Sequence, residues 1–219
     1  MTDPVPNIAN PVPENTDTTK KAFTWLALGD SYTVGEGITS KESFPYQVVN
    51  ILRTKGIEFN NPKVVARTGW TTDELQAAIE NSPLHEQYDV VTLLIGVNNQ
   101  YRKGHVADYA PAFESLLKQA IHFAGDNARR VIVLSIPDWS VTPFGAGTTQ
   151  AEIASEIDQF NEANKHVAEK YSVHYLNITP STRQAARDSA LIAEDGLHPS
   201  GKEYSKWAKK VAAIIRSGL

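Results

Sequence analysis

The strongest constraint on the fold is the alternation of short apolar runs with longer segments of helical spacing. Two runs, 88–95 (YDVVTLLI) and 130–136 (RVIVLSI), are continuous and rich in β-branched residues, which is typical of parallel strands buried on both faces. Further strands are predicted at 23–28, 63–66 and 173–178. Apolar residues recur at helical spacing within 42–55, 72–79, 109–121, 153–168 and 204–215. This order predicts an α/β fold with a mostly parallel sheet covered by helices on both faces.

Residues 1–21 differ from the rest of the 219-residue chain, because 4 of its 12 prolines lie there among Asn and Thr. Such a composition favours an extended, solvated tail. Residues 22–219 are then expected to form one domain, which is large enough to bury roughly 70% of its unfolded surface. The tail lacks the basic start and apolar stretch of a signal peptide, so a cytoplasmic location is expected for the sequence as it stands. The alternative is an exported, periplasmic form whose signal has been removed.

Composition excludes several classes of function. The chain has no cysteine, which excludes disulfides, a thiol nucleophile and thiolate metal sites. Its net charge of −4 provides no basic field to attract nucleic acid. No apolar run approaches the roughly 18 residues of a membrane-spanning helix. The 6 histidines show no paired metal-ligand spacing, so neither a metal nor another cofactor is predicted.

The segments that follow the strands carry the candidate chemistry, since the carboxyl ends of parallel strands meet at one edge of a sheet. The first strand is followed by GDSYTVGEG, in which Ser31 can expose both its hydroxyl and its backbone N–H at that edge. Gly-Asp-Ser is also a common turn composition. The segment has neither the GxGxxG spacing nor the terminal Gly-Lys-Ser/Thr of nucleotide-binding loops, which argues against phosphate binding.

Three further segments each allow a catalytic role and a plain structural one. Gly69, before a helix, can point its N–H groups at an anion, and the amide of Asn98 can stabilise a developing oxyanion. Either segment is equally well explained as a turn. Asp195 lies three residues before His198 and can hold its Nδ1, which leaves Nε2 free to act as a base. A surface Asp–His pair is the structural alternative.

Together and in this order, the segments resemble the SGNH (GDSL) hydrolase family over residues 22–217. GDSYTVGEG resembles the first block of the family and ARTGW the second. GVNN resembles the third and DGLHP the last. The resemblance implies that Ser31 is the nucleophile and that Asp195 and His198 are the acid and the base. The family often has Asp at the position of Asn99, a departure that concerns local hydrogen bonds in this loop rather than the catalytic set.

The resemblance further implies that Ser31, Gly69 and Asn98 form the oxyanion hole. It implies a three-layer α/β/α fold with a flavodoxin-like, five-stranded parallel sheet. The implied function is that of a serine hydrolase, acting through an acyl-enzyme on short or medium acyl esters or on lysophospholipid-like substrates. This chemistry requires no cofactor, and a small-molecule acyl ester is the expected partner. The sequence does not indicate an oligomeric state.

Two alternatives keep the same triad, namely an acyltransferase and a carbohydrate O-acetylesterase. A more distant alternative is a non-enzymatic, flavodoxin-like binding module, which would leave the DGLHP segment unexplained.

Substrate contacts are expected from loops beside the proposed site. The loop 137–147 (PDWSVTPFGAG) places Trp139 and Phe144 at a strand end, where they can offer apolar area to an acyl chain or leaving group. Trp139 could instead simply plug the edge of the sheet. Tyr32 and Tyr101 are expected near the mouth. Arg102, also near the mouth, is expected either to meet an anionic group on the substrate or to remain solvated.

Overall fold

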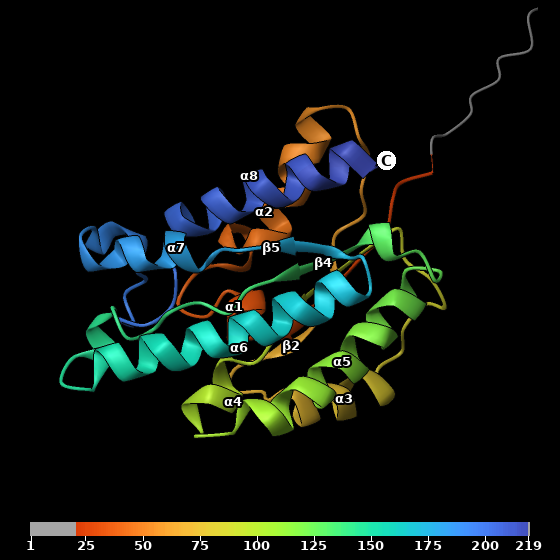
Figure 1. The fold of residues 1–219 in the computed structure, drawn as a ribbon. Coiled ribbons are helices and arrows are strands. Elements are labelled where there is room, and N and C mark those ends of the chain that lie inside the picture. Colours follow the sequence, from red (N-terminus) through yellow and green to blue (C-terminus); the bar gives the residue numbers. More distant parts are fainter. Residues whose placement is uncertain (1–20, 219) are drawn as a thin grey trace, which may run out of the picture.

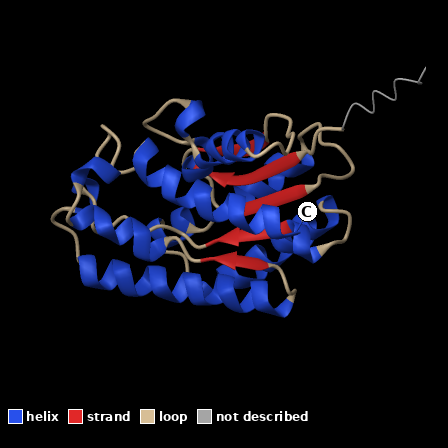
Figure 2. Ribbon diagram, turned by 90° about the horizontal axis from the view of Figure 1, so that it is seen from above, coloured by secondary structure: helices blue, strands red, loops and turns tan. Residues whose placement is uncertain are grey.

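The computed structural model describes residues 21–218 and is built on a five-stranded, all-parallel sheet in the order β2-β1-β3-β4-β5. The strands are β1 (Trp25–Asp30), β2 (Lys63–Arg67), β3 (Val90–Leu94), β4 (Val131–Leu134) and β5 (His174–Leu176). Figure 2 shows the arrowheads on the same side of the molecule, so the carboxyl ends form one edge. The predicted fold class is confirmed. The predicted tail lies outside the described residues except for Lys21.

Helices cover both faces of the sheet and complete a three-layer α/β/α arrangement (Figure 1). One face carries α2 (Phe44–Thr54) and α8 (Gly201–Gly218), and the other carries α3 (Thr72–Glu80), α5 (Val106–Phe123) and α6 (Gln150–Lys170). The short helices are α1 (Ser31–Val34), α4 (Val97–Tyr101) and α7 (Thr179–Thr182). The 3₁₀ turns are η1 (Ser40–Glu42), η2 (Ala128–Arg130), η3 (Pro143–Gly145), η4 (Arg183–Ala186) and η5 (Ser189–Leu191). Because α1 follows β1 directly and only two residues separate β3 from α4, both helices place their first residues at the carboxyl edge.

The core explains why the continuous apolar runs become central strands. Every residue of β1, β3 and β4 is buried, whereas the edge strands β2 and β5 are partly exposed. Above the sheet, the ring of Phe44 in α2 lies 6.5 Å from Tyr204 and 6.3 Å from Trp207, both in α8. The apolar stripe of the last helix is therefore buried within this chain.

The first strand runs two residues beyond the predicted 23–28 and ends at Asp30. Gly29 continues the strand because it pairs with Ala66 on one side and Leu94 on the other. A Cβ at Gly29 would lie 2.5 Å from the carbonyl oxygen of Leu94, so this position has no room for a side chain. As a result, the polar residues Asp30 and Ser31 emerge directly at the sheet edge.

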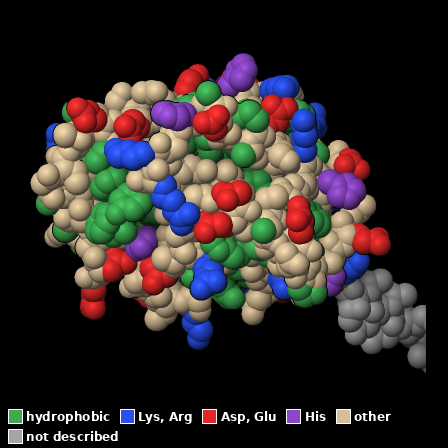
Figure 3. Space-filling view, turned by 90° about the horizontal axis from the view of Figure 1, so that it is seen from below, with side chains coloured by type: hydrophobic (Ala, Val, Ile, Leu, Met, Phe, Trp, Pro, Cys, Tyr) green, Lys and Arg blue, Asp and Glu red, His purple; other side chains and the backbone are tan. Residues whose placement is uncertain are grey.

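Surface charge is mixed. Figure 3 shows acidic and basic side chains dispersed over one face, with hydrophobic side chains gathered at one end of it. Within residues 21–218, no helix is long and apolar enough to cross a membrane.

Candidate active site

Ser31, His198 and Asp195 form a continuous hydrogen-bonded chain at the carboxyl edge of the sheet. Ser31 Oγ lies 2.9 Å from His198 Nε2, and His198 Nδ1 lies 2.7 Å from Asp195 Oδ2. Ser31 begins α1, while the other two residues come from the loop before α8. Ser31 and His198 are buried. The structure thus brings together a hydroxyl, a base beside it and an acid that orients the base, which is the arrangement that activates a serine.

The loop that carries the acid and the base is held closed at its ends. An antiparallel bridge joins Ile192 to Pro199. Asp195 Oδ1 accepts 2.9 Å hydrogen bonds from the backbone N–H groups of Leu197 and His198, so that Oδ2 faces the imidazole. Partial burial opposes ionisation of Asp195, but these two hydrogen bonds and the contact with the imidazole outweigh it and lower the pKa of the carboxyl. Asp195 is therefore charged at neutral pH.

Gly37, in the loop after α1, allows Asp195 to take this position. Its φ is +77°, a backbone conformation that favours glycine. A Cβ at Gly37 would lie 2.6 Å from Asp195 Oδ2. The last glycine of GDSYTVGEG is thus a point of close approach to the carboxylate. Sequence analysis did not single it out.

Asp30 is a buried carboxylate beside Ser31, and sequence analysis treated it only as part of a turn. It caps α1, because its Oδ1 accepts a 3.0 Å hydrogen bond from the backbone N–H of Tyr32. Its Oδ2 is buried without a hydrogen-bond partner. Burial raises the pKa of Asp30 to about 7, although the backbone N–H groups of Tyr32 and of Asp30 itself act in the opposite direction. An Asp at the start of a helix is an N-cap signal, and this signal could have identified the capping role of Asp30 from the sequence.

Tyr32 packs against His198 from one side. Its side chain is buried, and its ring centroid lies 5.0 Å from that of the His198 imidazole. Packing against the ring restricts the orientations available to His198.

The loops after β2 and β3, which carry the two predicted oxyanion donors, are bonded to each other. Asn98 Nδ2 donates a 2.9 Å hydrogen bond to the carbonyl oxygen of Trp70, which leaves its second N–H free of this bond. Asn99 accepts from the Thr72 N–H at 3.2 Å and donates to the Thr72 hydroxyl at 3.0 Å. The neutral Asn99 thus makes turn contacts of the kind expected at this position. Gly69 lies next to Trp70 and has a φ of +86°.

A cavity of about 110 Å³ opens beside Ser31. Its lining is mainly apolar and consists of Ser31, Tyr32, Val97, Asn98, Tyr101, Trp139, Phe144, Leu197 and His198. Four of the residues expected near the substrate, Tyr32, Tyr101, Trp139 and Phe144, therefore face the same space as Ser31 and Asn98. Gly69 and Arg102 lie outside this lining.

An aromatic group forms one wall of the cavity. The Trp139 ring lies 5.4 Å from Tyr101 and 5.8 Å from Phe144, in edge contacts. Trp139 is buried, whereas Tyr101 and Phe144 are about half exposed, at 49% and 48%. Trp139 thus lines the cavity and is packed into the core, so the structure is compatible with both roles considered for it.

Arg102 is held away from the cavity. Its Nη2 donates a 2.7 Å hydrogen bond to the carbonyl oxygen of Gly69 and lies 3.3 Å from Glu74 Oε2. The expected contact with an anionic substrate group stays a prediction. The Arg102 side chain is half-exposed and lies outside the cavity lining, and both oxygen acceptors contact its Nη2.

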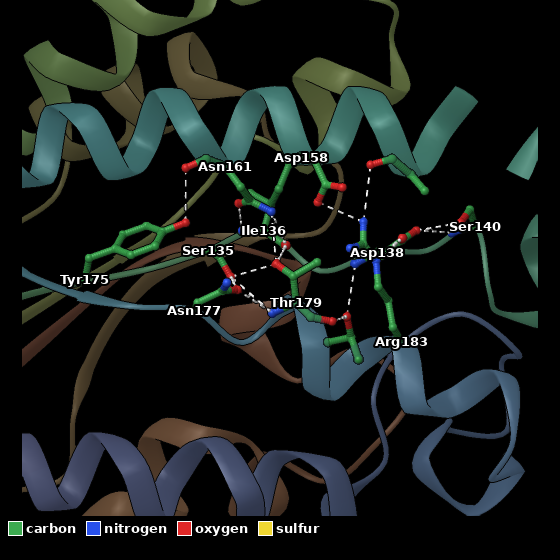
Figure 4. Close-up of polar contacts among 12 residues, drawn as sticks. Ser135, Ile136, Asp138, Ser140, Asp158, Asn161, Tyr175, Asn177, Thr179 and Arg183 are labelled. Carbon is green, nitrogen blue, oxygen red and sulfur yellow. Dashed lines mark hydrogen bonds and ion pairs between the residues drawn. The ribbon is translucent and has the colours of Figure 1, made fainter. Parts of the chain in front are cut away.

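The loop that carries Trp139 is fixed from behind by a polar network (Figure 4). Asn161 in α6 accepts from the backbone N–H of Ile136 at 2.7 Å and donates to its carbonyl at 3.1 Å. Arg183 donates a 2.8 Å hydrogen bond to the buried carboxylate of Asp138. These bonds hold the backbone of Ile136 and the side chain of Asp138, which precede Trp139 in the chain.

Gln100 fixes the Trp139 ring itself. Its Oε1 accepts a 2.8 Å hydrogen bond from the indole N–H, and its Nε2 donates to Glu156 at 2.6 Å. Gln100 is buried two residues after Asn98, so the same short helix supports the aromatic wall and the amide donor. Sequence analysis missed Gln100, since a glutamine in a helix carries no local signal of burial.

Comparisons with known proteins agree with this architecture. The model of the GDSL-like Lipase/Acylhydrolase family matches residues 27–206. No curated protein sequence gives a significant match.

Within residues 21–218, no group of three or more His, Asp and Glu side chains is arranged to hold a metal ion.

Several solved structures share the fold. TesA superposes with a TM-score of 0.69 at 18% identity, covering 90% of this chain and 99% of its own. Axe2, an acetylxylan esterase from Geobacillus stearothermophilus, gives 0.67 at 19% identity and covers 88% and 94%. A lipase/acylhydrolase from Enterococcus faecalis gives 0.66 at 19% identity and covers 89% and 96%. At these identities the similarity establishes the fold.

Proposed function

The chain belongs to the GDSL-like lipase/acylhydrolase family and is a carboxylic ester hydrolase, and we propose that it cleaves small acyl esters through Ser31, His198 and Asp195. The observation that carries this proposal is the hydrogen-bonded chain that runs from Ser31 Oγ through His198 to Asp195, of which Ser31 and His198 line an apolar cavity. Each member has a neighbour suited to its role, and the nucleophile faces a space where a substrate can sit.

The first half of the reaction forms an acyl-enzyme. Ser31 Oγ attacks the carbonyl carbon of the ester while His198 Nε2 takes the hydroxyl proton. Asp195 holds the imidazole through Nδ1–H and stabilises the imidazolium. The C–O bond to the alcohol then breaks, and the imidazolium protonates the leaving oxygen.

The second half releases the acid. Water replaces the alcohol, and His198 takes its proton as the water oxygen attacks the acyl carbonyl. The tetrahedral intermediate collapses, the bond to Ser31 Oγ breaks, and the imidazolium returns the proton to the serine. In both halves we assign the oxyanion to the backbone N–H groups of Ser31 and Gly69 and to the Asn98 amide.

The cavity favours a short, apolar acyl group. Its volume of about 110 Å³ is small for an extended fatty acyl chain, and its wall consists of Tyr32, Trp139, Phe144 and neighbouring apolar groups. We assign Trp139 and Phe144 to contacts with the acyl group or the alcohol.

The test is a series of p-nitrophenyl esters from acetate to palmitate, together with lysophospholipid and acetylated xylooligosaccharides. Wild type should favour the short esters, and Ser31→Ala should lose about 10⁶ in kcat. Ser43→Ala is the matched control, because Ser43 is also buried near α1 but bonds only to the Ser40 carbonyl in η1. Purified Ser31→Ala that keeps more than a few per cent of activity would refute the assignment. Acyl transfer to added glycerol in preference to water would identify an acyltransferase instead.

A further inference from the structure

Arg102 links the two loops to which the oxyanion donors are assigned. It ends α4, four residues after Asn98, and its guanidinium reaches across to the carbonyl oxygen of Gly69 at 2.7 Å. We propose that Arg102 is a positioning residue for the oxyanion hole, which holds the Gly69 backbone in its donating orientation. This inference rests on the function proposed above.

Close packing does not restrain Gly69 on the side where its Cβ would lie, and the backbone hydrogen bond from the Trp70 N–H to the Arg67 carbonyl is long, at 3.3 Å. The φ of Gly69 is +86°, and glycine passes readily between backbone conformations. Around the position that its Cβ would occupy, the one neighbour within 4 Å is Arg102 Nη2 at 3.9 Å. The orientation of this residue therefore depends on polar contacts rather than on enclosing side chains.

Two polar contacts fix successive peptide planes after Gly69. Arg102 bonds to the Gly69 carbonyl and fixes the plane between Gly69 and Trp70. Asn98 bonds to the Trp70 carbonyl and fixes the next plane. Because a peptide unit is planar, holding one carbonyl orients the whole unit. The Gly69 N–H belongs to the preceding unit, between Thr68 and Gly69, and the two units meet at the Gly69 Cα. Arg102 therefore acts on this N–H indirectly, because holding the following unit anchors the Gly69 Cα, and loss of the contact would let the Cα and the N–H move together.

Glu74 holds Arg102 in place from the first turn of α3. Its Oε2 lies 3.3 Å from Arg102 Nη2 and also accepts a 2.9 Å hydrogen bond from the Thr71 backbone N–H. The hydrogen bond from Thr71, and to a smaller extent Arg102, lowers the pKa of Glu74, so it stays charged at neutral pH. The guanidinium is thus held between a helix terminus and the Gly69 carbonyl.

Because Arg102 and Glu74 are exposed, a positioning role of Arg102 can be distinguished from a role in stability. The Arg102 side chain is 53% exposed and that of Glu74 is 40% exposed. Such exposed pairs contribute little to stability, so removing Arg102 should change Tm by no more than about 3 °C. Loss of a whole oxyanion donor costs roughly 10²–10³ in kcat, so a misdirected donor should cost about 10- to 100-fold.

The experiment compares Arg102→Ala and Arg102→Lys with Lys103→Ala. Lys103 is the matched control, because it is the next residue and lies 3.8 Å from Glu156, away from Gly69. For each variant we would measure Tm, kcat and KM on p-nitrophenyl acetate, and the affinity for an alkylboronic acid, whose adduct with a serine mimics the tetrahedral intermediate. Arg102→Ala should lose about 10- to 100-fold in kcat and in boronate affinity, with KM within about twofold. Arg102→Lys should recover part of the lost kcat and part of the lost boronate affinity, and Lys103→Ala should match wild type in both quantities.

Wild-type kcat in Arg102→Ala would overturn the inference. A raised KM at unchanged kcat would do so as well, because it would indicate direct substrate binding. These results are distinguishable from failure of the proposed function. If Ser31→Ala is inactive while Arg102→Ala equals wild type, only the role of Arg102 is lost. If Ser31→Ala retains activity, the proposed catalytic site itself is wrong.

Discussion

Replacing Asp30 by Asn should alter the pH dependence of stability in a defined direction. Burial raises the pKa of Asp30 from 3.8 to about 7 in the folded protein. Between these values the folded state holds a proton that the unfolded state releases, so the free energy of unfolding falls as pH rises from about 4 to about 7. The difference of about 3 pKa units corresponds to at most about 4 kcal/mol at 1.36 kcal/mol per unit.

Asp30→Asn removes this ionisation and keeps an oxygen that can accept the hydrogen bond from the Tyr32 N–H. The measurement is urea unfolding of both proteins at intervals between pH 4.5 and pH 8. Over this pH range the free energy of unfolding of the variant minus that of wild type should rise by about 3 kcal/mol and level off above pH 7. Asp195, whose lowered pKa has the opposite effect, is common to both proteins and cancels in the difference. A difference that is flat across this range would refute the reasoning.

Three further substitutions test other parts of the site. Asn98→Ala should lose roughly 10²–10³ in kcat with little change in KM, as measured by steady-state kinetics, and an unchanged kcat would remove Asn98 from the oxyanion hole. Trp139→Ala should shift the ester preference toward longer acyl chains, because Trp139 also lines a smaller cavity of about 20 Å³ behind the active site. An unchanged chain-length profile would exclude its role as a wall. Arg183→Met should lower the free energy of unfolding by about 2–3 kcal/mol, because it leaves the buried Asp138 carboxylate without its cation. When Asp138→Asn is added to Arg183→Met, chemical denaturation should show that part of the lost free energy of unfolding returns. No recovery would show that the pair does not act through charge.

The fold and the catalytic candidates could be predicted from local signals. The run 88–95 is apolar at nearly every position, and such a run is stable only when both faces of its strand are covered. The strand ends then place Ser31 and Asn98 at the same edge. The three-residue spacing between Asp195 and His198 allows the contact that the structure shows at 2.7 Å.

The remaining features depend on neighbours that are distant in the sequence. Arg102 is 33 residues from Gly69, and its own segment indicated only a contact with the substrate or a solvated side chain. Gln100 is buried only because Trp139 and Glu156 close over it. The raised pKa of Asp30 comes from burial of the whole strand end. None of these contacts has a local pattern, so their discovery required the assembled structure.

The central claim is that Ser31 is the nucleophile, and covalent trapping tests it most directly. The protein is incubated with a p-nitrophenyl alkylphosphonate, and the site of attachment is mapped by mass spectrometry of its peptides. We expect one phosphonyl group per chain, attached to Ser31, with loss of esterase activity in the same proportion and no labelling of Ser31→Ala. Attachment at a different residue, or full loss of activity with Ser31 unmodified, would contradict the account.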